Sequence, residues 1–429
     1  MSDTIDAVIG RRVWDSRGRP TVEVEIRTTS GAMGRAIAPA GASTGSGEAL
    51  DRRDGGPAFA GLDVRGAVAS VNGEIAEALK GRPVDDQAGI DRGLVELDGT
   101  GDKSRLGGNA IIATSMALAH AAAASAGLPL WRHLAGEGEP GPLPLPEIQI
   151  LGGGAHAARR VDVQDFMVIA VGASDYPTAL DWTADVYRAA GRILADAGKL
   201  QGVADEGGFW PAFDSNEEAL DCLLRAIEAS GHAPGDDVAI ALDIAASDFG
   251  TGGRYTLARD GREIDSDGLS EMLLGWLAKY PVVSIEDPLG EDDEEAFARF
   301  TKAAPAGVQV VGDDLVTTNA PRIAKCAALG AGNTALIKPN QIGTLSETHE
   351  ALETARAKGW GAIVSARSGE TEDVTIVHLG VGWGIPQLKV GSFTRSERMA
   401  KWNEGLRLAE QVPTGTALPP RTAYPWGRK

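Results

Sequence analysis

The sequence predicts an α/β protein: a β/α barrel preceded by a smaller N-terminal α+β domain. Short apolar runs recur in the second half of the chain, and most are separated by helix-like stretches; they are VAIALDIAASDF, VVSIEDPL, VQVVGDDL, TALIKPNQIG, GAIVSARSGE and QLKVGSF. Strands that are apolar on both faces and alternate with helices predict a parallel sheet. A doubly wound open sheet is the alternative, but no Gly-rich dinucleotide-binding fingerprint follows a first strand, so we favour the barrel.

The N-terminal part has a different pattern. TVEVEIRTT (21–29) alternates apolar and polar residues, as a half-buried antiparallel strand does, and NAIIATSMALAHAAAASAG (109–127) is an Ala-rich helix that is apolar on most sides. Proline and glycine are dense in the segment LAGEGEPGPLPLPE that follows, and neither residue continues a helix or a central strand. We therefore predict an α+β domain over 1–134, a linker over 135–147, and a barrel carrying the active site over 148–429.

Composition limits the function classes. The 429 residues carry a formal charge of −19, with 43% hydrophobic and 24% charged residues, which argues against binding to nucleic acid or to an anionic membrane. An anionic substrate would therefore have to meet local cations or metal ions. The N-terminal segment MSDTIDAVIG does not resemble a signal peptide, and the cysteines Cys222 and Cys326 fit small core residues in a reducing compartment. We expect a cytoplasmic protein.

Charged residues end the predicted barrel strands. In a β/α barrel the C-terminal strand ends meet at one face, where catalytic residues lie. Three carboxylates come first along the chain and three cations follow: Asp243, Glu286, Asp313, Lys338, Arg367 and Lys389. An all-oxygen set without Cys or His suits a hard cation, so the carboxylates predict a Mg²⁺ site.

Lys338 follows the apolar run TALI, so its stem should be buried. A metal ion and Lys389 nearby would both lower its pKa. A lysine close to neutrality can remove a proton from the carbon beside a carboxylate, and the metal ion would stabilise the dianion that forms. The sequence thus predicts Lys338 as a general base.

Two loops carry further candidates. GVADEGGFWP (202–211) contains Glu206, whose proton would be held to higher pH by nearby carboxylates and could pass to a leaving hydroxide; a turn with capping acids is the alternative. APAGASTGSGEAL (38–50) contains Ser43. It could close over a substrate and offer Ser43 to a second metal ion, or it could be a flexible connector.

The chain resembles the enolases (phosphopyruvate hydratases) over nearly its whole length. The strings that carry the resemblance are DSRGRPTVEVEI, GASTG, LGGNAI, DEGGF, SNEEAL, SIEDPL, VGDDL, IKPNQIGTL, RSGETED and RMAKWNEGLR. The resemblance implies an N-terminal α+β domain, a barrel that begins ββαα and continues as (βα)6, and a homodimer. It also implies the use of a lysine base with Mg²⁺ that stabilises an ene-diolate.

The resemblance assigns a role to each matching residue. Lys338 would be the base and Glu206 the acid, assisted by Asp165. Mg²⁺ would bind Asp243, Glu286 and Asp313, and a second Mg²⁺ would reach Ser43 when substrate binds. The substrate-binding residues would be His156, Lys389 for the carboxylate, and Arg367 and Ser368 for the phosphate.

The departures from the family pattern lie in the substrate loops. Ala366 replaces a histidine beside Arg367, and Gly47 replaces a second histidine. Other changes are Ala40 for serine, Gly152 for asparagine, Asp165 for glutamate and Pro339 after the base lysine. The residues for proton removal and metal binding are all retained. The changes therefore bear on what the site binds more than on its chemistry.

Three functional hypotheses follow. The first is a specialised relative that dehydrates a phosphoglycerate analogue with a larger phosphorus group, as carboxyphosphonoenolpyruvate synthase does in phosphinothricin-type antibiotic pathways; Ala366 would then leave room for the extra carboxylate. The second is a housekeeping glycolytic enolase. The third is a non-catalytic enolase-like binding protein. For each, the expected ligand is a small phospho- or phosphono-acid.

Overall fold

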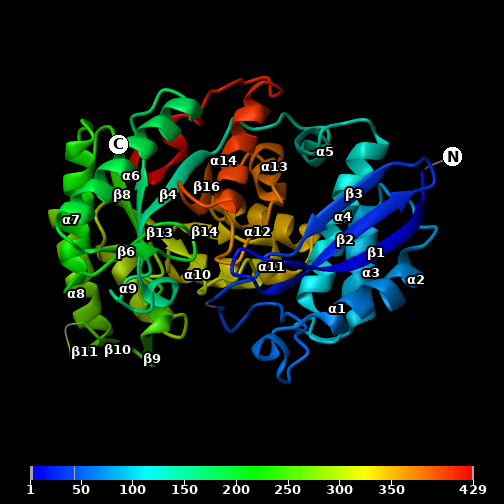
Figure 1. Ribbon diagram of the computed structural model, residues 1–429, viewed down its shortest axis with the longest axis horizontal. Helices are drawn as coiled ribbons and strands as arrows, with labels where there is room; N and C mark the ends of the chain where they lie inside the picture. Colours follow the sequence, from blue (N-terminus) through cyan, green and yellow to red (C-terminus); the bar gives the residue numbers. More distant parts are fainter. Residues whose placement is uncertain (1–2, 43, 260, 428–429) are drawn as a thin grey trace.

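The structure is a computed structural model that describes residues 3–42, 44–259 and 261–427. An N-terminal sheet with its helices lies on one side of the molecule, and a barrel surrounded by helices forms the other side (Figure 1). No helix in the described ranges is long and apolar enough to cross a membrane. Cys222 and Cys326 are free and buried, as small core residues would be.

The N-terminal region has the predicted α+β composition. Three antiparallel strands form a sheet in chain order: β1 (Ile5–Trp14), β2 (Pro20–Thr28) and β3 (Met33–Ile37). Five helices accompany it: α1 (Arg65–Ser70), α2 (Ala76–Leu79), α3 (Gln87–Asp98), α4 (Gly108–Ser125) and α5 (Leu130–Ala135). The predicted Ala-rich helix is α4, and nearly all of its residues are buried. Its small side chains let β2 and β3 pack closely against it.

The barrel is closed and has eight strands. They are β4 (Leu145–Gly152), β5 (Asp165–Ile169), β8 (Ala239–Asp243), β12 (Val282–Glu286), β13 (Gln309–Gly312), β14 (Thr334–Ile337), β15 (Gly361–Ser365) and β16 (Gln387–Ser392). Pairing of β16 with β4 closes the ring. β5 runs antiparallel to both of its neighbours, and the other pairs are parallel. The predicted ββαα(βα)6 barrel is confirmed.

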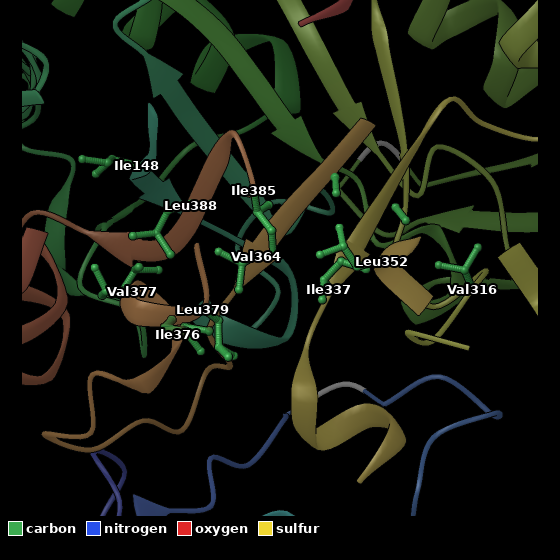
Figure 2. Close-up of a cluster of buried hydrophobic side chains, with 14 of the residues drawn as sticks. Ile148, Val316, Ile337, Leu352, Val364, Ile376, Val377, Leu379, Ile385 and Leu388 are labelled. Carbon is green, nitrogen blue, oxygen red and sulfur yellow. The ribbon is translucent and has the colours of Figure 1, made fainter. Parts of the chain in front are cut away.

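Helices cover the outside of the barrel. They are α6 (Tyr176–Asp196), α7 (Asn216–Ala229), α8 (Ser266–Lys279), α9 (Glu294–Ala303), α10 (Ala320–Leu329), α11 (Pro339–Ile342), α12 (Leu345–Ala357), α13 (Thr375–Gly382) and α14 (Ser396–Ala409). Outward-facing strand residues such as Val364 and Leu388 lie near Val377 and Leu379 of α13 (Figure 2). This apolar packing on the outer face leaves the inner face of the strands free to carry polar side chains.

Two short antiparallel pieces are inserted in the barrel. β6 (Leu200–Val203) and β7 (Phe209–Pro211) form a hairpin that extends the sheet beyond β4, and β9 (Gly250–Thr251), β10 (Arg254–Leu257) and β11 (Arg262–Asp265) form a separate sheet. The turn between β6 and β7 carries Glu206.

β4 begins inside the segment that the sequence analysis assigns to the linker. Pro146 belongs to this strand and pairs with Leu388. A proline fits because the preceding residue, Leu145, donates the hydrogen bond to Pro386 O at 2.9 Å. On the other side β5 ends opposite Glu147, so the missing N–H of Pro146 leaves no ladder bond unmade.

We predict that Gly34→Ala destabilises the N-terminal domain. A Cβ atom at Gly34 would lie 2.1 Å from Ala121 N and 2.2 Å from Ala117 O, and backbone atoms of a packed helix cannot move away without strain. The expected loss is about 2 kcal/mol or more, seen as a lower midpoint of thermal unfolding. Gly275→Ala is the control, because Gly275 is exposed in α8 with open space around it; it should gain about 0.5–1 kcal/mol. Similar effects of the two changes would contradict the packing described here.

Candidate active site

Four acidic residues lie at the ends of neighbouring strands. Asp243 ends β8 and is in register with Glu286 at the end of β12 and with Asp165 at the start of the antiparallel β5. Asp313 directly follows β13. All four residues are buried. The structure therefore brings Asp165, Asp243 and Glu286 to one level of the barrel mouth. Asp313 lies two residues beyond Val311, the partner of Glu286.

Lys389 lies inside β16 instead of at its end, because the strand continues through a register shift at Gly391. Its Nζ donates to Asp243 Oδ2 at 2.8 Å and to Glu286 Oε2 at 2.7 Å. Burial opposes its charge, but Asp243, Glu286 and Asp165 outweigh burial and raise the pKa of Lys389 well above its usual value. Lys389 thus neutralises the acidic cluster directly.

The expected lowering of the Lys338 pKa is wrong for this structure. The Nζ of Lys338 donates to Asp313 Oδ2 at 2.5 Å. Burial would lower the pKa of Lys338, but the negative charges of Asp313 and Glu286 outweigh burial and raise it. In the same pair, burial would raise the pKa of Asp313, and Lys338 and Arg367 lower it. The expectation assumed a metal ion beside Lys338. In the structure, the Asp313 carboxylate faces the Lys338 amine.

The donor set fits a hard divalent cation. Glu286 Oε1 is buried and has no hydrogen-bond partner among the described residues, so one oxygen of the cluster remains available to a ligand. Among the described residues, the group of three acids whose carboxylate oxygens lie within 4.8 Å of one another is Asp287, Asp313 and Asp314, which shares only Asp313 with the predicted ligands. Asp287 accepts the backbone N–H groups of Asp313 and Asp314 at 3.0 and 2.8 Å. We infer that Asp287 orients this loop, while Asp243, Glu286 and Asp313 would hold the ion.

Glu206 is held on the opposite side of the same mouth. Its backbone O accepts Ser392 N at 2.9 Å, which fixes the turn against β16. Gln149 of β4 links this turn to Asp165: its Nε2 donates to Asp165 Oδ1, and its Oε1 accepts Gly208 N at 2.8 Å. The sequence analysis missed Gln149, although a polar residue within an otherwise apolar strand was a signal for it.

Arg367 and Ser368 lie just beyond β15 in a loop that α14 fixes. Arg398 is fully buried and donates to the backbone O atoms of Arg367 (2.7 Å), Ser368 (2.5 Å) and Val390 (2.8 Å). Lys401, also fully buried, donates to Glu370 Oε2 at 2.8 Å. These two helix residues, spaced three apart, hold the loop that would bind phosphate.

The Arg367 guanidinium already contacts a carboxylate. Its Nη1 and Nη2 donate to the two Glu48 oxygens at 2.9 and 3.1 Å. Burial would lower the pKa of Arg367, but Glu48 and Asp313 raise it. From the N-terminal domain, Arg17 Nη1 donates to Ser368 Oγ at 3.1 Å. The sequence analysis did not single out Glu48 or Arg17, because both contacts join segments far apart in the chain.

Local packing accounts for some departures from the family pattern. A Cβ at Gly152 would lie 2.5 Å from Ala204 Cβ, and one at Gly47 would lie 2.5 Å from Arg322 Nη1. Pro339 occupies the first turn of α11, where a backbone N–H is not needed. These glycines and this proline therefore fit their surroundings.

Most of the predicted residues line one small cavity of about 20 Å³. They are Asp165, Glu206, Asp243, Lys338, Ala366, Arg367, Ser368 and Lys389. Glu286 and Asp313 adjoin it through Lys389 and Lys338. Ser43 lies outside the described residues, and so does the side chain of His156, whose backbone belongs to a short 3₁₀ turn. The predicted base, acid and anion-binding residues therefore share one site.

Glu147, in β4, is a further buried acid below the site. It is in register with Lys389, and its Oε2 has no hydrogen-bond partner among the described residues. Burial raises the pKa of Glu147 to about 7; the charge of Lys389 opposes this shift, and those of Asp243 and Asp165 add to it. The sequence analysis did not identify Glu147 as a site residue, because it assigned this residue to the linker.

Comparison with known families covers both parts of the chain. The family model described as "Enolase, C-terminal TIM barrel domain" matches residues 141–419. The model described as "Enolase, N-terminal domain" matches residues 5–134.

We predict that Glu147→Gln removes part of the pH dependence of stability. The unfolded chain releases this proton near the usual value of 4.5 and the folded protein near 7, so the wild type loses stability as pH rises through this window. Between about pH 5 and about pH 8 the loss is about 2–3 kcal/mol. Denaturant unfolding with a chelator present should show a flatter profile for E147Q. The exposed Glu350→Gln should keep the wild-type slope; equal slopes in all three proteins would contradict the shift.

Proposed function

Since the chain belongs to the enolase family, we propose that it is a Mg²⁺-dependent hydro-lyase that removes the α-proton of a 2-phosphoglycerate-like acid and eliminates water to give an enolpyruvate product. The observation that carries this proposal is the convergence of Lys338, Glu206 and Arg367 on one cavity beside the acidic cluster. A base, an acid and an anion-binding group around one small space are what such an elimination requires.

Each group has a distinct task. Bound Mg²⁺, held by Asp243, Glu286 and Asp313, would supply the positive charge that stabilises a carboxylate dianion. The Lys338 ammonium must first release a proton to solvent, which becomes easier once its ion pair with Asp313 opens. The neutral amine then accepts the α-proton at Nζ. Glu206, fixed across the mouth by Ser392, donates a proton to the departing hydroxide.

The remaining residues orient the substrate. Lys389 binds its carboxylate, and Arg367 and Ser368 bind its phosphorus group, with His156 and Ser43 contributing from the two loops. Asp165 acts on Glu206 through Gln149, which contacts both Asp165 and the Glu206 turn.

We further propose that the substrate is a carboxyphosphono analogue of phosphoglycerate, so that the enzyme is a carboxyphosphonoenolpyruvate synthase of phosphonate or phosphinate antibiotic biosynthesis. Ala366 supports this assignment: it lines the cavity beside Arg367 with a methyl group at a position where the family pattern has an imidazole. A homodimer and a cytoplasmic location remain predictions from the sequence.

Two other functions have specific observations in their favour. A housekeeping enolase would retain the same chemical groups, and the cavity of about 20 Å³ is small, which favours a small substrate. A non-catalytic binding protein would agree with the internal pairing of Lys338, Lys389 and Arg367 with carboxylates. Measuring the turnover of the two candidate substrates distinguishes the three functions.

The experiment offers the protein 2-phosphoglycerate and the carboxyphosphono acid in turn, each with Mg²⁺, and follows enolpyruvate absorbance. We expect kcat/KM for the carboxyphosphono acid to be higher by about 100-fold, because Ala366 leaves room for its larger phosphorus group. Faster turnover of 2-phosphoglycerate would establish the housekeeping function. Binding without elimination of either acid would identify a binding protein.

Lys338→Ala should abolish exchange of the substrate α-proton with solvent deuterium, with a rate loss of about 10²- to 10⁴-fold. Mg²⁺ affinity should not fall, because the change frees Asp313 from its ion pair. Deuterium exchange followed by NMR and titration calorimetry with Mg²⁺ give the two readouts, and the exposed Lys358→Ala is the control. Retained exchange in K338A would mean that another group is the base.

A further inference from the structure

A second cavity adjoins the catalytic one and is much larger, at about 250 Å³. Arg367 and Gly41 line both cavities. We call the larger cavity the annex. Its lining includes four arginines and two carboxylates, namely Arg17, Arg19, Arg53, Arg367, Glu48 and Asp51. On a chain with a formal charge of −19, this local excess of positive charge favours an anionic ligand.

The four arginines differ in whether the protein already pairs their side chains. Arg53 is paired with Asp51 at 2.6 Å and also donates to two backbone O atoms. Arg19 is exposed, and its side chain makes no hydrogen bond or ion pair with any described residue. The annex therefore contains a guanidinium whose charge no nearby carboxylate of the described chain neutralises.

Arg17 connects the annex to the proposed phosphate site. Its side chain is only 5% exposed, and its Nε is buried without a hydrogen-bond partner among the described residues. Its Nη1 donates to Ser368 Oγ at 3.1 Å, and its Nη2 donates to Ala40 O at 2.9 Å and forms an ion pair with Asp15 Oδ2 at 3.4 Å. A buried N–H that lacks an acceptor is unfavourable, so an anion that reaches Arg17 would satisfy it.

The position of Glu48 indicates which ligand group can bind where the two cavities meet. Glu48 lines the annex, and its carboxylate accepts hydrogen bonds from Nη1 and Nη2 of Arg367. This is the planar arrangement of two hydrogen bonds that a guanidinium and a carboxylate form. A ligand carboxylate can take this position only if Glu48 leaves it. The protein's own side chain therefore marks a carboxylate position next to the phosphorus-binding residues.

We propose that the annex is a second anion subsite, in which Arg367, Arg17 and Arg19 bind the acidic group that the substrate carries on its phosphorus after Glu48 moves aside. This inference rests on the proposed function, and it adds the annex to the room that Ala366 leaves beside Arg367. The catalytic cavity measures about 20 Å³ and the annex about 250 Å³, so the annex offers the larger space for this group.

The test compares two probes by titration calorimetry on the Mg²⁺-loaded full chain. Phosphonoformate carries a carboxylate directly on phosphorus, and inorganic phosphate does not. We expect the wild type to bind phosphonoformate more tightly than phosphate by about tenfold or more. In Arg19→Gln the ratio of the two dissociation constants should fall to about 3 or less. Arg192→Gln is the matched control, since Arg192 is also exposed and unpaired among described residues but lies far from either cavity's lining; it should keep the ratio.

A second variant tests the role of Glu48. Glu48→Gln removes the competing negative charge, so phosphonoformate should bind about threefold more tightly or better. Equal binding of the two probes by the wild type would overturn the subsite, and so would an unchanged ratio in R19Q or weaker phosphonoformate binding in E48Q.

Turnover separates this inference from the proposed function. If the protein dehydrates the carboxyphosphono acid but R19Q leaves KM for it unchanged, the function stands and the subsite fails. The protein could instead prefer 2-phosphoglycerate as substrate and still bind phosphonoformate more tightly than phosphate, with that preference lost in Arg19→Gln. In that case the subsite stands and the proposed substrate fails.

Discussion

The active-site architecture depends on one buried ammonium group shared between two carboxylates. Lys389 Nζ lies 2.8 Å from Asp243 and 2.7 Å from Glu286, and all three side chains are buried. Buried carboxylates repel one another strongly unless a cation compensates them. The strand register places Lys389 inside the ring of acids, so the barrel geometry supplies this compensation. A divalent ion bound at the same carboxylates would compete with the lysine for their oxygens.

The same principle explains the other charged contacts of the site. Lys338 pairs with Asp313, and Arg367 with Glu48. Lys338, Lys389 and Arg367 thus each already have a carboxylate partner in the protein. Under the proposed function, ligand binding would be an exchange of partners, in which a metal ion would take the carboxylates and a substrate anion the cations. In such an exchange fewer buried charges are left without a partner than if the metal ion and the anion bound separately.

The sequence predicted the barrel and the convergence of the charged strand ends, because these depend on local patterns, whereas the ββαα(βα)6 order came from the resemblance to the enolases. Apolar runs mark strands, and a polar residue such as Asp243 or Glu286 at the end of a run marks the mouth. The side-chain roles remain predictions. The pKa of Lys338 was mistaken because it depends on which charge faces the amine, and that is a property of packing. Glu48 and Arg17 were missed for a similar reason: their partners Arg367 and Ser368 are more than 300 residues away in the chain.

The position of Arg398 has a consequence for synthesis of the chain. This residue belongs to α14, the last α-helix, and its guanidinium joins the backbone O atoms of Arg367, Ser368 and Val390. Because a chain emerges from the ribosome from its N-terminus onward, the Arg367–Ser368 loop stays without these donors until α14, which follows it in the chain, has also emerged. A chain that stops before α14 therefore lacks the contacts that fix this loop.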